Sequence, residues 1–377
     1  MFFAGKKIYL PTAIFFTVAP VITAIFIPWY VLNFDVKWQT WIFALLFAAA
    51  TNLSITAGYH RLFSHKSYEA KKWVENLFLF IGASAFQGSA LKWSSDHRVH
   101  HTFVDSEADP YNIKKGFFYA HMGWLFFEDS VNRKIHAPDL EKNKSVMLQD
   151  KYYLVFAIFS GFLFPAIISS LWTDALGGLL VAGLLRIVLT QQSTFFVNSL
   201  CHTLGDQTYS KEITARDSWL VAVLTHGEGY HNFHHKFQID YRNGIKWYQW
   251  DPTKWVIQTL ALFGQAYQLR MVPAAEILKA RLLAQTKELS AMGVANQKLE
   301  QIRERIFEAQ NRIREIKRNY DDLKINMQST KDQKFENMKV RMNEIRAELQ
   351  LANIELKNQL EAWSTYVAYL KSLATVS

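Results

Sequence analysis

Residues 39–65 read QTWIFALLFAAATNLSITAGYHRLFSH, an apolar stretch that leads directly into a polar segment containing His60 and His65. A helix needs roughly 20 apolar residues to cross a bilayer core of about 30 Å. Residues 39–59 meet that requirement, and the two histidines follow at the end of the run. The stretch therefore predicts a membrane helix with two imidazoles at one of its ends.

Three other apolar stretches have the length of a membrane helix: residues 8–32, 152–172 and 176–200. Pro20 and Pro28 lie inside the first, where we expect them to kink the helix, as membrane helices tolerate. Half of the 377 residues are hydrophobic, which alone would also fit a large soluble domain. The length of the apolar runs instead favours an all-α integral membrane protein with four transmembrane helices.

A fifth apolar run, residues 74–91, is short and contains Glu75, Asn76, Gln87 and Ser89. We predict an interfacial or partly buried helix there. If this run crossed the bilayer, everything after it would lie on the opposite side.

The distribution of Lys and Arg predicts how the spans are oriented. Basic residues gather before the first span, in residues 60–151 and in the tail, whereas the connections 33–38 and 173–175 are short. The positive-inside rule then places both termini and residues 60–151 in the cytoplasm. Membrane topology thus explains the net charge of +9, and no basic stripe with interleaved aromatics points to nucleic acid.

Histidines recur in clusters on this predicted cytoplasmic side. Residues 97–101 read HRVHH and residues 231–235 read HNFHH. Positions i, i+3 and i+4 share one helix face, so each cluster directs two or three imidazoles the same way. Residues 60–65 read HRLFSH, where a spacing of five suits two ligands only if the helix bends or ends, or if the histidines serve different ions.

Nine histidines form the candidate ligand set: His60, His65, His97, His100, His101, His202, His231, His234 and His235. Nine imidazoles are too many for one ion, so we expect two ions with four or five nitrogens each, held in a cytoplasmic helical cap. Zinc is usually satisfied by four ligands, whereas iron takes more and keeps a position open for oxygen, so ligand count favours iron. Asn198, one turn before the sixth histidine, would hold a metal-bound water or satisfy a backbone group. We read His121, His136 and His226 as ordinary histidines, and the single cysteine, Cys201, leaves no cysteine cluster for metal.

The three clusters together resemble the histidine boxes of the membrane fatty-acid desaturases, in particular the stearoyl-CoA (delta-9) desaturases. The likeness includes WSSDHRVHHTFVDSEADPYN from residue 93 and GEGYHNFHHKFQIDYRNGIKWYQWDPTKW from residue 227, and it covers roughly residues 8–270. It implies a di-iron site that activates O2 and removes two hydrogens from an acyl chain, leaving a cis double bond near the ninth carbon. It also implies that the nine histidines bind the metals and that Asn198 holds a metal-bound water.

The resemblance further suggests a kinked tunnel for the acyl chain near Gln87 and Trp93, although Trp93 is equally well explained as an interfacial anchor. Small residues of the second span, Ala44, Ala48 and Ala49, would lie toward the end of that tunnel or simply pack against other helices.

Charged residues at the tunnel mouth bear on the substrate's head group. Asp96 and the pair Lys114 and Lys115 match the resemblance, whereas Ser95 stands where animal relatives have a basic residue. The two lysines would bind the phosphates of coenzyme A or face anionic lipid. Acyl-CoA and acyl-lipid substrates both stay open, with acyl-CoA favoured. Because the sequence contains no cytochrome b5-like segment, we expect a separate electron donor, such as a ferredoxin or a cytochrome b5-like protein.

Residues 273–377 fall outside the resemblance and form a second predicted domain after a membrane domain, residues 1–272. Apolar residues recur at steps of three and four, as in a coiled-coil seam. The seam runs through Leu299, Ile302, Ile306, Ala309, Ile313, Ile316, Tyr320, Leu323 and Met327, and resumes at Met338, Met342, Ile345, Leu349, Ala352 and Leu356. The break at residues 328–334 is a stutter in one helix or the turn of an antiparallel hairpin. Self-association, docking of an electron donor and folding back on a neighbouring helix are the alternatives for this tail.

Two other functions compete with desaturation. A lipid hydroxylase or ketolase would use the same metal platform, because both reactions begin with hydrogen abstraction. A non-catalytic metal store or transporter belongs to a different class, but transport would want ligands along a path across the bilayer rather than on one side.

Overall fold

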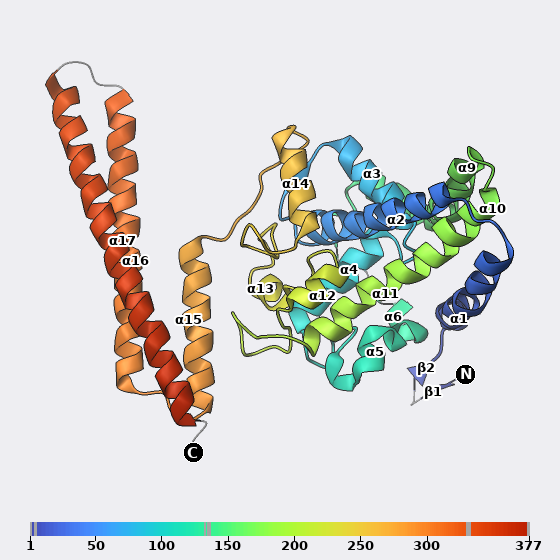
Figure 1. Ribbon diagram of the computed structural model, residues 1–377, viewed down its shortest axis with the longest axis horizontal. Helices are drawn as coiled ribbons and strands as arrows, with labels where there is room; N and C mark the ends of the chain where they lie inside the picture. Colours follow the sequence, from blue (N-terminus) through green and yellow to red (C-terminus); the bar gives the residue numbers. More distant parts are fainter. Residues whose placement is uncertain (1, 4–5, 132, 134–136, 329–332, 375–377) are drawn as a thin grey trace. The chain divides into compact units, whose positions relative to one another are not determined.

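Nearly all regular structure in the computed structural model is helical, and the chain divides into a first unit, Met1–Val272, and a second unit, Pro273–Ser377. The structure describes residues 2–3, 6–131, 133, 137–328 and 333–374 (Figure 1).

Among the described residues of the first unit, four helical segments are long and apolar enough to cross a membrane: Leu10–Asn33, Trp38–Ser64, Tyr153–Ser170 and Ala175–His202. The first is helix α1, and the second joins α2 (Trp38–Leu53) to the π-helix η1 (Ser54–Ser64). The third consists of α8 (Tyr153–Ile158), η4 (Phe159–Leu163) and α9 (Phe164–Ser170). The fourth consists of α10 (Ala175–Gly177), η5 (Gly178–Leu185), α11 (Arg186–Ser199) and η6 (Leu200–His202). The prediction of a four-span, all-α membrane protein is confirmed.

The outward faces of these spans are strongly apolar. Leu32, Leu45 and Leu171 are 84%, 72% and 79% exposed. So many exposed large apolar side chains would be unfavourable in water but suit contact with lipid tails. Pro20 and Pro28 lie within α1, which continues past both.

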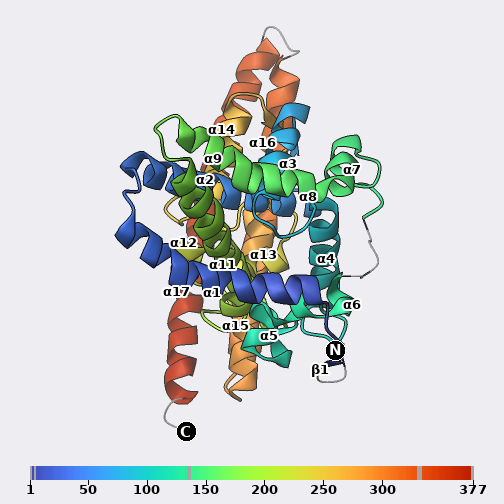
Figure 2. The same ribbon diagram turned by 90° about the vertical axis from the view of Figure 1, so that its right-hand side faces the viewer.

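Asp174 ties together the two connections at the end of the spans away from the histidines. Its carboxylate accepts hydrogen bonds from the backbone N–H of Lys37, at 3.1 Å, and from the hydroxyl of Thr40. Trp172 Nε1 also donates to the Thr40 hydroxyl, at 2.8 Å. The two helical hairpins are therefore joined at this end, and α2 packs against α11 and η5 along their length (Figures 1 and 2).

The second span differs from its predicted bounds, because the helix continues beyond residue 59 as far as Ser64. Over these residues it is a π-helix, in which hydrogen bonds reach one residue further than in an α-helix. The backbone N–H of His65 still donates to His60 O, at 3.1 Å, and the helix ends there. Because the helix is wider here and ends at His65, two histidines five residues apart can serve one site.

Shorter helices and connecting segments form the cap that carries most histidines. They are α3 (Lys72–Ala83), α4 (Ala90–Phe103), η2 (Ile113–Lys115), α5 (Phe117–His121), η3 (Gly123–Phe126), α6 (Glu128–Val131), α7 (Lys144–Lys151), α12 (Trp219–Leu224), α13 (His231–Lys236) and α14 (Pro252–Leu262). Two short antiparallel pairs complete the unit, β1 (Phe2–Phe3) with β2 (Lys6–Lys7) and β3 (Glu69–Ala70) with β4 (Ala266–Tyr267). The doubtful run at 74–91 contributes α3 and is not among the spans.

The described residues of the second unit form three helices, α15 (Ala274–Ala291), α16 (Gln297–Gln328) and α17 (Gln333–Ala374). Leu299 and Ile306, near the start of α16, pack against Trp363 and Leu370, near the end of α17. The two helices are therefore antiparallel, and the hairpin alternative is the one observed. Leu289 of α15 completes this core, so the predicted seam packs against neighbours of its own chain.

Candidate metal centre

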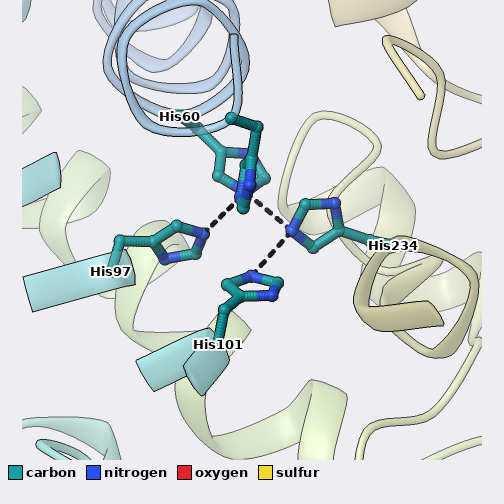
Figure 3. A group of neighbouring side chains, drawn as sticks. His60, His97, His101 and His234 are labelled. Carbon is teal, nitrogen blue, oxygen red and sulfur yellow. Dashed lines mark hydrogen bonds between the residues drawn. The ribbon is translucent and has the colours of Figure 1, made fainter. Parts of the chain in front are cut away.

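Five histidines form a first group: His60, His65, His97, His101 and His234. They come from the end of the second span, from α4 and from α13, and one nitrogen of each lies within 4.8 Å of the others. His234 Nε2 is 3.0 Å from the Nε2 atoms of His60 and of His101. Figure 3 shows the rings of His60, His97, His101 and His234 pointing toward one another. The i, i+4 pair of α4 thus faces both the span and α13.

Four histidines form a second group: His100, His202, His231 and His235. The nitrogen pairs His100 Nε2–His235 Nε2 and His231 Nε2–His235 Nε2 are 3.2 and 3.0 Å apart. His202 Nε2 is buried without a hydrogen-bond partner among the described residues. All nine predicted histidines therefore fall into two groups, of five and of four, as the ligand count required.

The chemistry of these groups fits metal ions. Burial, followed by the neighbouring imidazoles, lowers the pKa values of His97, His101 and His235 well below the usual range, so these rings are neutral. Two neutral imidazoles can share one N–H···N hydrogen bond, but five ring nitrogens that converge within 4.8 Å of one another also suit a cation at their centre. Two nitrogens about 2.1 Å from one ion and at right angles to each other are about 3 Å apart, which matches the observed separations.

Carboxylates lie behind two of the rings. Asp109 Oδ1 accepts a hydrogen bond from His100 Nδ1, at 2.8 Å, which fixes the tautomer of that ring and directs its Nε2 into the second group. Glu228 Oε2 lies 3.0 Å from His60 Nδ1, as a close charge contact. Burial alone would raise the pKa of Glu228, but His60 and Arg61 bring it down to about 2, so it is ionised.

Hydroxyl groups contact two further histidines of these groups. Thr214 Oγ1 is 2.8 Å from His202 Nδ1 and donates to Asp105 Oδ1 at 2.6 Å. Tyr111 OH is 3.3 Å from His97 Nδ1. The sequence interpretation missed these supporting residues, because each lies far from its histidine in sequence or outside the helical spacing that marked the ligands.

A buried ion network anchors Glu228. The guanidinium of Arg61, which is 1% exposed, donates to Glu228 Oε1 at 3.0 Å and to both carboxylate oxygens of Asp251, at 3.0 and 3.1 Å. It also donates to Tyr241 O, at 2.8 Å. Asn243 Nδ2 donates to Glu228 Oε2. The carboxylate behind His60 is thus held from several sides.

Both groups open onto one cavity of about 700 Å³, whose walls are mostly apolar. His60 and His97 of the first group line it, as do His100 and His231 of the second. The predicted substrate residues Gln87, Trp93 and Asp96 and the predicted water holder Asn198 also line it. The Trp93 ring stacks on the His97 ring, with centroids 5.0 Å apart, and Gln87 donates to Thr194.

Other predicted residues lie elsewhere. Lys114 and Lys115 are exposed, are not among the residues that line the cavity, and contact Asp105 O and Glu107. Ala44 packs against the fourth span in an apolar cluster, as in the helix-packing alternative. Two basic residues that the sequence interpretation missed contact Asp96 instead: Lys92, at 2.7 Å, and Arg133, at 3.2 Å.

The remaining histidines stay outside both groups. His121 is buried, and its ring nitrogens lie 2.9 Å from Ser199 Oγ and from Gln192 Oε1. His226 belongs to neither group, and His136 lies outside the described residues.

Residues 37–270 match the family model described as fatty acid desaturase, which is more than half of the chain. The chain belongs to the fatty acid desaturase family. The predicted resemblance is thereby confirmed, and the family together with the two histidine groups supports a metal cofactor in this integral membrane protein.

Several curated desaturases are similar to this chain. A probable acyl-CoA desaturase of Schizosaccharomyces pombe is 44% identical over 254 residues, which cover 67% of this chain and 53% of that protein. Acyl-CoA desaturase 1 of Saccharomyces cerevisiae is 40% identical over 256 residues, covering 67% and 50%. Human stearoyl-CoA desaturase is 36% identical over 251 residues, covering 64% and 69%. The chain thus spans about half the length of the first two relatives.

Replacing Asp109 by Asn in this desaturase-family protein is expected to weaken metal binding by about 10- to 100-fold, because His100 loses the carboxylate that orients it. Competition with a chelator, followed by metal analysis of the purified protein, measures the change. Glu107→Gln is the matched control, since Glu107 lies in the same segment with a side chain 92% exposed. Unchanged metal affinity in Asp109→Asn would contradict the orienting role.

Proposed function

We propose that this protein is an acyl-CoA desaturase that uses two iron ions and O2 to introduce a cis double bond near the ninth carbon of a saturated chain. One observation carries the proposal: both histidine groups border the same largely apolar cavity. The names of the relatives, acyl-CoA desaturase and stearoyl-CoA desaturase, support both the reaction and the substrate class.

The reaction balances with an external reductant. A saturated –CH2–CH2– unit, O2, two electrons and two protons give –CH=CH– and two molecules of water. When bound, the irons supply the oxidising power that breaks unactivated C–H bonds, which no side-chain acid or base can do. Five nitrogens in one group and four in the other would leave room for Asn198 to hold a metal-bound water at the second group.

The chain's own residues would position the substrate. Apolar walls exclude water, and Trp93, stacked on His97, would keep the acyl chain against the histidine groups. Gln87 and Thr194 are polar residues of the cavity lining, and the hydrogen bond between them would satisfy both side chains in an otherwise apolar wall.

Charged residues of the cavity lining support acyl-CoA over acyl-lipid. Lys92, Asp96 and Asp150 line the cavity, and Lys92 and Arg133 both contact Asp96, so the lining carries charges of both signs. Basic groups of this kind can bind phosphates, as Lys114 and Lys115 would do further out.

Orientation and partners follow from the charge distribution. We infer that both termini and the metal centre face the cytoplasm, by the positive-inside rule. A separate one-electron carrier, such as a ferredoxin or a cytochrome b5-like protein, would deliver the electrons. Self-association of the tail would have to use other faces of its helices, because the seam residues already pack within the second unit.

Expression in a host that lacks delta-9 desaturation is expected to produce new monounsaturated chains. Mass spectrometry then locates the double bonds, with the acyl-CoA and phospholipid pools analysed separately. If the cells are fed a labelled saturated fatty acid, new double bonds that appear first in the acyl-CoA pool support acyl-CoA as the substrate. New double bonds that appear first in phospholipid favour acyl-lipid. Hydroxylated chains without new double bonds would refute desaturation and favour a hydroxylase.

A further inference from the structure

The fourth span contains a buried arginine that the proposed reaction does not use. Arg186 is 2% exposed and lies within Ala175–His202, with no carboxylate in ion-pair contact among the described residues. A charged side chain inside a membrane segment is costly and therefore marks a functional hypothesis. Its role has to come from the neutral groups that it binds.

All five N–H groups of Arg186 are used. Nε donates to Ala182 O at 2.7 Å, and Nη1 donates to Thr51 Oγ1 and Ser84 Oγ, at 3.1 and 3.3 Å. Nη2 donates to the carbonyls of Ser84 and Gly161, at 3.2 and 3.3 Å. One guanidinium thus links the second, third and fourth spans to the end of α3.

Ser84 begins a segment, residues 84–88, in which side chains hydrogen-bond to the backbone of four residues. Gln191, five residues further along the same span, donates to Ala85 O and Phe86 O, both at 3.2 Å. The backbone N–H of Gly88 donates to Tyr153 OH, at 2.9 Å. This clamping maintains a φ of 54° at Phe86, a left-handed conformation that costs a bulky residue free energy.

The clamped segment forms a wall of the cavity. Phe86, Gln87 and Gly88 line it, and the Phe86 ring stacks on that of Phe15, another lining residue, with centroids 5.8 Å apart. Gly161 makes room for this ring, because a Cβ there would lie 2.6 Å from Phe86 Cε2. Arg186 therefore binds both sides of this wall. It holds Ser84 at the start of the segment, and it holds Gly161, which faces the Phe86 ring.

We propose that Arg186 is a positioning residue that fixes the wall at residues 84–88 and thereby selects which carbons of the acyl chain face the histidine groups. The inference rests on the proposed function and deepens it. The alkyl chain itself carries no polar group along its length, so beyond the anchored head group only the shape of the cavity can set its register. A rigid wall gives one register, and a loosened wall admits several.

Arg186→Lys keeps the charge but loses the planar fork that reaches Ser84 and Gly161 together. The expected result is a ratio of off-position to main double bonds that rises at least about fivefold, since one methylene in an apolar pocket changes discrimination by about 10- to 200-fold. Lipid mass spectrometry of expressing cells measures positions and chain lengths. Binding of saturated acyl-CoAs that differ by two carbons, measured on the purified protein, is expected to lose its length preference.

Gly161→Ala tests the same wall without touching the arginine, and it keeps the inference falsifiable if Arg186→Lys does not fold. Its methyl group would displace the Phe86 ring into the cavity, so the preferred chain length is expected to shorten. Ser160→Ala is the matched control, because Ser160 Oγ donates only to Phe156 O in its own helix.

The outcomes separate this inference from the proposed function. If the wild-type protein makes no unsaturated chains, the proposed function fails. If the wild type makes them and both wall variants keep its distribution of positions and its length preference while the yield falls, Arg186 is merely structural and the inference fails.

Discussion

Replacing His100 by Ala is expected to reduce formation of unsaturated chains to the host background. The imidazole is one of only four in its group, faces His235 across 3.2 Å and borders the cavity. Its removal leaves three nitrogens for one ion and takes from Asp109 its side-chain partner, so that only two backbone N–H groups still donate to this carboxylate. Metal content is expected to fall from about two ions per chain to about one, because affinity depends on ligand number. Lipid analysis and metal analysis of the purified protein check the two effects.

The matched control is His121→Ala. This histidine is also buried but bonds Ser199 and Gln192 rather than either histidine group. Its replacement is expected to leave the metal content unchanged, and both variants should reach the membrane in wild-type amounts. Wild-type product levels from His100→Ala would show that the second histidine group is not the site of the chemistry.

Arg61→Met is expected to destabilise the first unit by about 3–5 kcal/mol, because it leaves Glu228 and Asp251 buried without their cation. The same change frees Glu228 to move away from His60, so metal content should fall as well. Thermal unfolding in detergent measures the stability.

Two further variants serve as controls for the stability of Arg61→Met. Lys66→Met removes the exposed partner of Asp139, with a side chain 52% exposed, and such surface pairs contribute only about 0–1 kcal/mol. Arg61→Met combined with Glu228→Gln should recover part of the lost stability, since the cost comes from the uncompensated charge. If Arg61→Met alone were as stable as the wild type, the ion network around Arg61 would not be needed for the fold.

The grouping of the histidines was largely predictable, because spacing on helices determines which side chains share a face. HRVHH and HNFHH needed only the α-helical period, and α4 and α13 have it. His60 and His65 did not fit that period, because the helix that carries His60 is a π-helix. No simple sequence signal marks such a helix. The structure resolves the difficulty by placing both in one group.

The carboxylates behind the ligands were not predictable in this way. Glu228 lies three residues before His231 but supports His60, which comes from another part of the chain. Lys92 likewise supplies the charge beside Asp96 that Ser95 could not, one helical turn earlier than expected. Contacts between elements depend on packing, which periodicity within one element does not describe.

The tail shows the same limit. The seam was predicted from apolar steps of three and four, yet the steps alone fit one long helix and a hairpin equally well. The pairing of Leu299 with Leu370 decides for the hairpin, and α15 adds a third helix that the seam did not indicate.

The connections tied by Asp174 bear on how this protein is made. Between Asn33 and Trp38, and again between Ser170 and Ala175, only four residues separate consecutive spanning helices. In the proposed orientation, the insertion machinery would have to move only two tight turns across the bilayer, and every bulky polar segment would fold on the side where it was synthesised. Each hairpin can enter the lipid as a unit, and the carboxylate of Asp174 then fastens the second to the first.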